Sequence, residues 1–330
     1  MNQETLLLKR SDITRLLSLD ECIEAVETAF RMHGEGKAPT PGILGIHVED
    51  GGFHTKAGIM NYMGNYFVAK TNANFPQNGQ RFGLPTIQGV IIVSDADNGR
   101  LLCVMDSIEI TILRTGAATA VAAKYLSSPN SSKVIILGCG NQGRISARIL
   151  DRVRNLEVVY LYDIDMSAAD KLATELRSGL KASIVVVDDP SQAIYQSDII
   201  VTCTTSKKPL FAHGLVRPGT FIAAVGADSD TKQELDPLLF RSSTIVVDIT
   251  GQAATIGDLH HAIGEGMTTR SNVFAELGEI VSGRKKLKTS GNDIVIFDST
   301  GMALQDVAAA SIAFRKASAS GVGVKMSFAE

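Results

Sequence analysis

The sequence predicts an α/β protein in which a doubly wound parallel sheet domain is joined to a second, α+β domain. Three observations support this prediction. A glycine-rich G-x-G-x-x-G loop lies between two apolar runs near the middle of the 330-residue chain. Strand and helix patterns alternate through the part that follows it. The part that precedes it contains short alternating strands and a hairpin turn, which fits an antiparallel or mixed sheet better than βαβ units.

The glycine-rich loop has the surroundings of a dinucleotide-binding site. Residues 134–137 form an apolar run short enough for a buried parallel strand, and Gly138, Gly140 and Gly143 follow it. The first glycine permits the tight turn, the second lets backbone approach a pyrophosphate, and the third allows close packing of helix on strand. The next helix would then point its N-terminus at the phosphates.

Asp163 is the expected ribose contact. It ends the next apolar run, residues 158–162, and stands twenty residues after Gly143. An acid at this place accepts hydrogen bonds from a ribose 2′-hydroxyl and repels a 2′-phosphate, so NAD(H) is favoured, with NADP(H) as the alternative. The alternative is a glycine-rich turn in an α/β protein that binds no nucleotide. Such a turn would not require the strand, helix, second strand and terminal acid that surround this one. We therefore predict a Rossmann-type NAD-binding domain over residues 128–302.

Composition and charge do not indicate nucleic-acid or membrane partners. The chain is 45% hydrophobic and 20% charged, with a net charge of −3. No apolar run is long enough to span a bilayer, and the N-terminus lacks a secretory pattern, so a cytoplasmic location is expected. The cysteines Cys22, Cys103, Cys139 and Cys203 are scattered and are interpreted as reduced thiols. Because no metal-ligand spacing occurs, no metal is predicted.

The N-terminal part is predicted to contain one helix followed by several strands. Residues 11–36 have a helical pattern, with a capping box at Ser18 and Glu21. A hairpin turn is expected at residues 97–99. Strand patterns occupy residues 53–56, 66–70, 88–94 and 101–105.

A further helix, capped by Asp106 or Glu109, is predicted to run to Leu126 and to carry Arg114. Its second half consists of small residues, which permit close packing or approach by a ligand. The serine-rich segment 127–132 is the clearest linker. The first domain is thus predicted to span residues 1–127 and to be completed by a C-terminal helix at about 303–330.

Beyond the linker, alternating patterns predict the parallel sheet of the second domain. Helical stretches are expected at residues 167–178, 273–282 and 303–318. Strands are expected at residues 183–187, 199–203, 220–225, 244–248 and 294–297.

Four charged residues are candidates for substrate chemistry. Lys56 and Lys70 lie on predicted strands, Arg114 lies on a helix, and Asp228 follows a parallel strand at its carboxyl end, where ligands bind in open α/β sheets. Two or three cations and one carboxylate would suit a small anionic substrate beside a nicotinamide. Spacing alone allows a second interpretation, in which the lysines are solvated and Arg114 pairs with a nearby acid.

Several sequence motifs together resemble one family. They are AKTNANFPQN (69–78), LPT (84–86), LRTGAAT (113–119), GCGNQG (138–143), VGAD (225–228) with KQEL (232–235), and DSTG (298–301). Over nearly its whole length the chain is similar to the ornithine cyclodeaminase and mu-crystallin family, which includes alanine dehydrogenases and ketimine or pyrroline-2-carboxylate reductases.

The resemblance implies roles for individual residues. Lys70 and Arg114 would hold the substrate carboxylate, and Asp228 would be the catalytic acid at the substrate nitrogen or at an attacking water. Lys56 is a further candidate substrate contact on its charge and not through the resemblance. Lys70 is the second candidate catalytic residue. The resemblance also implies a homodimer formed through the sheet of the first domain. The expected cofactor contacts are Thr86, Thr115, Gly138, Gly140, Asn141, Gln142, Gly143, Asp163, Thr204, Val225, Gly226, Lys232 and Ser299.

Two departures from the family pattern bear on the substrate. Residues 38–41 lack the arginine that often precedes the first substrate strand. Lys56 stands near the place where cyclodeaminases carry a glutamate for the distal ammonium of ornithine, and a lysine repels an ammonium. We therefore expect an NAD(P)H-dependent oxidoreductase of a small α-imino or amino acid, such as Δ1-pyrroline-2-carboxylate, another ketimine, or the alanine/pyruvate pair. Ornithine cyclodeaminase and a non-catalytic, crystallin-like cofactor-binding protein are the alternatives.

Overall fold

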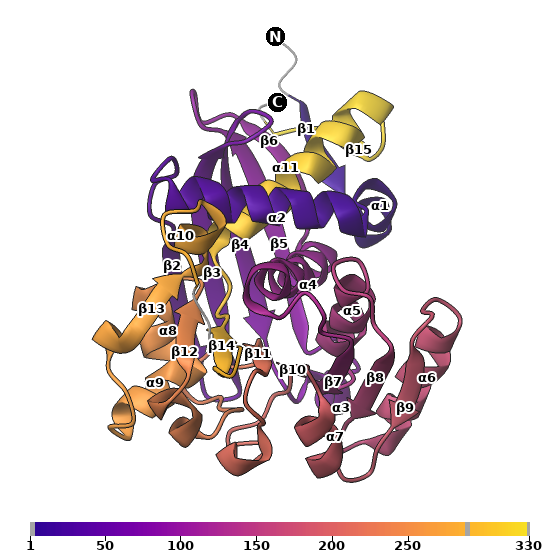
Figure 1. The fold of residues 1–330 in the computed structure, drawn as a ribbon. Coiled ribbons are helices and arrows are strands. Elements are labelled where there is room, and N and C mark those ends of the chain that lie inside the picture. The colour runs from indigo at the N-terminus through magenta and orange to yellow at the C-terminus, as the bar shows by residue number, and fades with distance from the viewer. Residues whose placement is uncertain (1–3, 288–290, 329–330) are drawn as a thin grey trace. The chain divides into compact units, whose positions relative to one another are not determined.

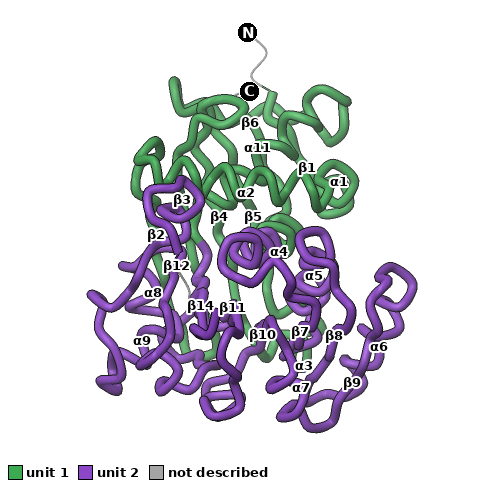
Figure 2. The backbone as a smooth tube through the Cα atoms, viewed as in Figure 1, with its two compact units in different colours: residues 1–114, 302–330 green, residues 115–301 purple. Residues whose placement is uncertain are grey.

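A computed structural model describes residues 4–287 and 291–328, and the chain divides into two compact units (Figures 1 and 2). Unit 1 comprises residues 1–114 and 302–330, and unit 2 comprises residues 115–301. The division falls inside helix α4 (Ser107–Leu126), whereas the sequence placed it at residue 127. The second half of α4 packs with unit 2, since a Cβ on Gly116 would lie 2.8 Å from Ile145 of that unit.

Unit 1 contains a mixed sheet, as predicted. Its strand order is β15-β1-β6-β5-β4-β3-β2, and all neighbouring strands are antiparallel except β1 and β6. The sequence patterns did not indicate β1 and β15, which pair with each other at one edge. The strands are β1 (Glu4–Leu8), β2 (Gly42–Val48), β3 (Gly51–Asn61), β4 (Asn65–Asn74), β5 (Ile87–Asp95), β6 (Leu101–Asp106) and β15 (Val324–Ser327).

The predicted N-terminal helix is two helices, α1 (Arg10–Leu16) and α2 (Leu19–Gly34). The prediction of one helix is wrong at Leu17, which is extended with φ −118° and ψ 108°. The capping box at Ser18 and Glu21 is confirmed, and it explains the break because it satisfies the first backbone N–H groups of a new helix. A short helix, α3 (Asn78–Phe82), lies between β4 and β5.

The C-terminal helix α11 (Ala303–Ser320) belongs to unit 1. It packs on α2 and on strands β3 and β4. Residues paired across antiparallel strands point to the same face of the sheet, so the register shows which side chains share a face. Lys56 pairs with Lys70 and is buried with it, whereas Leu44 pairs with Thr55 and is exposed. One face is therefore covered and charged, and the other is apolar and open.

Unit 2 is the predicted doubly wound domain, with strand order β13-β12-β14-β11-β10-β7-β8-β9 and parallel neighbours throughout. Strand β7 lies between β8 and β10, so the chain reverses its winding there, and ligands bind at such a switch point. The strands are β7 (Lys133–Leu137), β8 (Val158–Tyr162), β9 (Ser183–Val186), β10 (Ile199–Thr202), β11 (Phe221–Ala224), β12 (Thr244–Val247), β13 (Val273–Glu276) and β14 (Val295–Asp298).

The helices of unit 2 correct one prediction. Residues 273–282 are not one helix, because residues 273–276 form β13 at the sheet edge and only residues 277–281 are helical. The run Val273-Phe274-Ala275 suits a strand as well as a helix, and pairing with β12 decides between them. The helices are α5 (Asn141–Leu150), α6 (Met166–Arg177), α7 (Ser191–Gln196), α8 (Thr250–Ile256), α9 (Asp258–Gly264) and α10 (Leu277–Val281), with 3₁₀ turns at His213–Leu215, Pro237–Arg241 and Arg270–Asn272.

The core of unit 2 lies at its sheet. Strand residues Ile135, Ile200, Ile222 and Ile296 are fully buried in one hydrophobic cluster. A rigid sheet of this kind holds the loops at its carboxyl edge in place. In the described part of the chain, no helix combines the length and the apolar character needed to cross a membrane.

Candidate active site

The glycine-rich loop has the geometry of a phosphate cradle at the carboxyl end of β7. Gly138 has φ +104° and donates its N–H to the carbonyl of Tyr162 over 2.9 Å. A Cβ on Gly143 would lie 2.0 Å from the carbonyl oxygen of Gly138, so only glycine allows this contact between helix and strand. A Cβ on Gly140 would meet nothing within 4 Å. Gly140, the N-cap of α5, therefore leaves the helix N-terminus open to a ligand.

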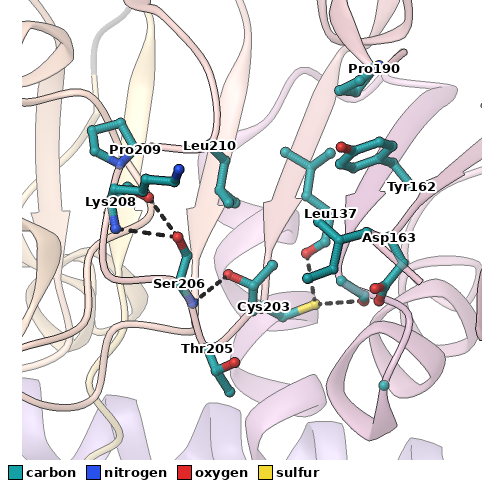
Figure 3. A pocket seen from close by; sticks show the side chains of 14 residues that line it. Leu137, Tyr162, Asp163, Pro190, Cys203, Thr205, Ser206, Lys208, Pro209 and Leu210 are labelled. Carbon is teal, nitrogen blue, oxygen red and sulfur yellow. Dashed lines mark hydrogen bonds between the residues drawn. The ribbon is translucent and has the colours of Figure 1, made fainter. Parts of the chain in front are cut away.

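A cavity of about 740 Å³ adjoins this cradle (Figure 3). It is formed by the ends of three neighbouring strands, β7, β8 and β10, and by the segments that follow them. Tyr162 and Asp163 lie on one side of Cys203 in the view, and Ser206 and Lys208 lie on the other. The cavity thus occupies the place at which open α/β sheets bind nucleotides.

The backbone holds the Asp163 carboxylate at the cavity. Its Oδ2 accepts the N–H of Cys139 at 2.7 Å, and its Oδ1 accepts the N–H of Asp165 at 2.9 Å. Each carboxylate oxygen can accept a second hydrogen bond. Asp163 therefore connects the glycine-rich loop to the end of β8 and still has capacity for a ribose hydroxyl.

Two predicted cofactor contacts carry buried polar atoms without a hydrogen-bond partner among the described residues. These atoms are Oε1 of Gln142, on the first turn of α5, and Oγ of Ser299, directly after β14. The backbone N–H of Ser299 donates to Ala224 over 2.9 Å, which anchors the loop. Buried polar atoms in native sites are normally paired, so unpaired ones at this edge fit a polar ligand. Together with the cradle, these residues fit a bound dinucleotide.

Glu234 ties two of the predicted contact loops together, a role that the sequence did not indicate. Its Oε1 accepts the N–H of Thr204 and its Oε2 accepts that of Gly226, at 2.5 and 2.9 Å. Val225 is anchored separately, since its N–H donates to Thr202. Glu234 is fully buried, and burial, with help from Asp258, raises its pKa to about 7. The KQEL motif contained this residue, but its two partners are fixed only by the fold.

Asp228 and Lys232 lie together on the loop that follows β11. The ammonium of Lys232 donates to Asp228 Oδ1 at 2.6 Å, and the Asp228 side chain is 51% exposed. The structure thus confirms the position of Asp228 after a parallel strand and adds an ion pair with a predicted cofactor contact.

Two of the three predicted threonine contacts, Thr115 and Thr86, fall in different units. Thr115 is buried on α4 in unit 2, where its carbonyl accepts the hydroxyl of Thr119. Thr86 is exposed in the segment before β5 of unit 1, and its carbonyl accepts the N–H of Phe75. Asn141 is exposed at the first position of α5, beside the cradle.

In unit 1 the candidate substrate cations gather around one carboxylate, that of Asp306 on α11. The Lys70 ammonium donates to Asp306 Oδ1 at 2.8 Å, and Arg114 Nε lies 3.1 Å from the same oxygen. Arg114 Nη1 also donates to Gln305 over 3.0 Å. Lys56, Lys70 and Arg114 retain only 9%, 3% and 6% exposure. Burial therefore excludes the interpretation of solvated lysines, while the expected acidic partner of Arg114 is present.

The charged groups of this cluster change each other's pKa values. Burial, followed by the fields of Arg114 and Lys56, lowers the pKa of Lys70 to about 7 in spite of Asp306. Burial alone would raise the pKa of Asp306, but Lys70 and Arg114 hold it below its usual range. The carboxylate is thus ionised, and the lysine titrates near neutrality. Sequence analysis missed Gln305 and Asp306, although a polar pair inside the otherwise apolar run 302–310 is the signal of a buried functional group.

Comparisons with known proteins identify the family of this chain. The sequence model of the ornithine cyclodeaminase/mu-crystallin family matches residues 3–321. The alanine dehydrogenase of Archaeoglobus fulgidus is 38% identical, over 98% of this chain and 99% of the relative.

Two solved structures share the whole fold. An archaeal alanine dehydrogenase dimer with bound NAD is 37% identical, covers 98% of this chain and 99% of its own, and has a TM-score of 0.94. The Δ1-pyrroline-2-carboxylate reductase of Thermococcus litoralis, in complex with NADH and L-proline, is 34% identical, covers 98% and 100%, and has a TM-score of 0.92.

Proposed function

Because this chain belongs to the ornithine cyclodeaminase/mu-crystallin family, we propose that it is an NADH-dependent oxidoreductase that reduces a small α-imino acid to the amino acid. The substrate is a cyclic ketimine such as Δ1-pyrroline-2-carboxylate or the imine of pyruvate, and the reverse reaction oxidises L-proline or L-alanine. Relatives named for each of these reactions share the fold across this chain. The same relatives support an enzyme over a non-catalytic binding protein.

The observation that carries the proposal is the buried cationic cluster of unit 1. Lys56, Lys70 and Arg114 are buried near the carboxylate of Asp306. Because these cations outnumber this carboxylate, binding of a substrate carboxylate beside them remains favourable. Arg114 and Lys70 supply the charge-assisted N–H donors for it. Lys56, opposite Lys70 in the sheet, makes this environment unfavourable for the distal ammonium of ornithine, which supports a reductase over a cyclodeaminase.

Unit 2 supplies the cofactor site and the acid. Gly138, Gly140 and Gly143 shape the cradle, Asp163 accepts from the ribose, and Gln142 and Ser299 offer polar atoms to the dinucleotide. The nicotinamide, when bound, supplies the hydride for the imine carbon. Asp228 holds the proton at the substrate nitrogen, so that charge developing there is stabilised. Lys232, its ion-pair partner, keeps the carboxylate in place.

The reaction class is tested by following NADH with three substrate sets. Enzyme and NADH are incubated with Δ1-pyrroline-2-carboxylate, or with pyruvate and ammonium, and enzyme and NAD are incubated with L-ornithine. Net NADH consumption with an imino acid is expected. Proline formation from ornithine without net redox change would instead identify a cyclodeaminase and overturn the proposal.

We predict that Asp163→Ser reduces the preference for NADH over NADPH. One hydrogen bond to the charged acceptor contributes about 1–2 kcal/mol, so the ratio of the two affinities should fall roughly 5–30-fold. Fluorescence titration with both cofactors measures the ratio, and Asp170→Ser, at an exposed acid on α6, is the control. A wild type that prefers NADPH contradicts this assignment of Asp163.

We also propose that the chain forms a homodimer through the open face of the unit 1 sheet. Register places Leu44, Ile46, Phe53 and Val90 on that face, and each is between 44% and 57% exposed. Several large apolar side chains exposed on one sheet face indicate an interaction surface, and in a two-fold dimer this face of each subunit packs against the same face of its partner. The archaeal alanine dehydrogenase relative is a dimer.

The dimer is predicted to dissociate when charge enters this face. Leu44→Glu combined with Ile46→Glu should give a monomer at micromolar concentration, because each partner would then bury unpaired negative charges. Light scattering measures the mass, and Leu238→Glu, at a partly exposed leucine of unit 2, is the control. A wild type that is monomeric at micromolar concentration contradicts the proposal.

A further inference from the structure

The carboxylate of Asp306 lies among the cations of the candidate anion site. Its side chain is 1% exposed, and its Oδ1 contacts both Lys70 Nζ and Arg114 Nε. Lys56 acts on the same carboxylate electrostatically, and the buried thiol of Cys22 on α2 faces it as well. The surrounding groups come from β3, β4, α4 and α2, whereas Asp306 comes from α11. One helix residue thus contacts or faces charged groups from three other elements and an uncharged thiol from a fourth.

Three buried cations without this carboxylate would repel each other. A buried lysine in such a place releases its proton, because desolvation and like charges both disfavour the ammonium. With all groups ionised, three positive charges and one negative charge leave a formal charge of +2. The cluster therefore keeps an excess of positive charge that attracts an anion, while its lysine remains able to carry a proton.

The neighbouring Gln305 fixes the arginine. A guanidinium has five N–H donors. Asp306 lies beside the donor at Nε of Arg114, and Gln305 accepts one at Nη1. The ion pair at Nε is close but poorly aligned, since Nε makes no hydrogen bond among the described residues. Helix α11 thus holds one side of the guanidinium and leaves three donors for another acceptor.

We propose that Asp306 is a positioning residue for substrate recognition, which aligns Lys70 and Arg114 and keeps the lysine protonated so that both donate to the carboxylate of the imino acid. The inference rests on the proposed function, because it assigns the substrate to this cluster. Asp306 itself acts through the two cations, and Gln305 assists by orienting the arginine.

A pH dependence of substrate affinity follows. The pKa of Lys70 is about 7, lowered first by burial and then by Arg114 and Lys56, while Asp306 opposes the shift. Affinity for the carboxylate is therefore greatest below pH 7, and KM rises as pH increases through this value. Removing the charge of Asp306 lowers the pKa further, so the same rise in KM begins at a lower pH.

The test is Asp306→Asn, which keeps the shape and removes the charge. At pH 7.5 we expect KM for the imino acid to rise at least tenfold, with a smaller change in kcat and an unchanged affinity for NADH. The rise of KM with pH should also move to lower pH, and Asp306→Glu should restore part of both properties. Asp12→Asn is the matched control, because Asp12 is a buried carboxylate of unit 1 paired with Arg15.

A role in folding alone would give a different result. The melting temperature of Asp306→Asn would fall while its KM-versus-pH curve matched the wild type, and that outcome overturns the inference. If Asp306→Asn does not fold, the inference is tested with Gln305→Ala and the wild type instead. Gln305→Ala should raise KM without moving the pH of its rise, and a wild-type KM that is flat from pH 6 to 8.5 overturns the inference.

A binding measurement separates this inference from the proposed function. Calorimetric titration of pyruvate into the NADH complex requires no turnover, so it remains informative if none of the imino acids is reduced. Binding that weakens at least tenfold in Asp306→Asn supports the positioning role. Equal binding in the wild type and the folded variant overturns it.

Discussion

Asp228→Asn is expected to reduce turnover at saturating substrate by about 10²–10⁴, the usual contribution of a positioned acid or base. The amide keeps the size of the carboxylate but cannot take up or release the proton at the substrate nitrogen. NADH affinity should change little, because the proposed dinucleotide contacts, the glycine-rich loop and Asp163, lie elsewhere in unit 2. Turnover, NADH affinity and melting temperature are measured together.

The alternative is that Asp228 only pairs with Lys232. The pair is half exposed on the aspartate side, and exposed ion pairs contribute about 0–1 kcal/mol, so stability would change slightly and turnover would stay near normal. A folded Asp228→Asn variant with near-normal turnover would therefore exclude the catalytic role. Asp230→Asn, an exposed acid on the same loop, controls for the loss of charge.

Arg114→Ala is expected to act mainly on KM, with an increase of about 10–150-fold. A hydrogen bond to a charged group contributes about 1.5–3 kcal/mol, and the substrate carboxylate makes this contact in both the ground state and the transition state. Initial rates give KM and kcat separately and show which of the two parameters the substitution changes. An unchanged KM with a reduced kcat would contradict carboxylate binding by Arg114.

Two further variants separate binding from folding at this position. Arg114→Lys keeps the charge but loses the planar fork, so its KM should lie between those of the wild type and Arg114→Ala. Arg154→Ala removes a half-buried arginine that donates to the carbonyls of Ala123 and Ser127 in unit 2. It should lower the melting temperature and leave KM near the wild-type value.

Comparison of prediction and structure shows where sequence patterns are reliable. The predicted positions of Gly138, Gly143 and Asp163 agree with the structure, because they depend on local backbone geometry and on strand ends that an apolar run reveals. The capping box at Ser18 was also found, yet the break before it was not recognised. Residues 273–276 were assigned to a helix because a short apolar run does not distinguish a helix from an edge strand.

The amino-acid sequence alone was enough to predict the alternation of strands and helices, the glycine-rich loop, and which charged residues could serve the chemistry. These features depend on periodicity and on steric limits within a few residues. Only the tertiary structure decided that Lys56, Lys70 and Arg114 are buried, that Asp306 joins the latter two, and that Glu234 connects the loops of Thr204 and Gly226. Lys70 and Asp306 are 236 positions apart, and no local pattern specifies such a pair, because it forms only when α11 packs on the sheet.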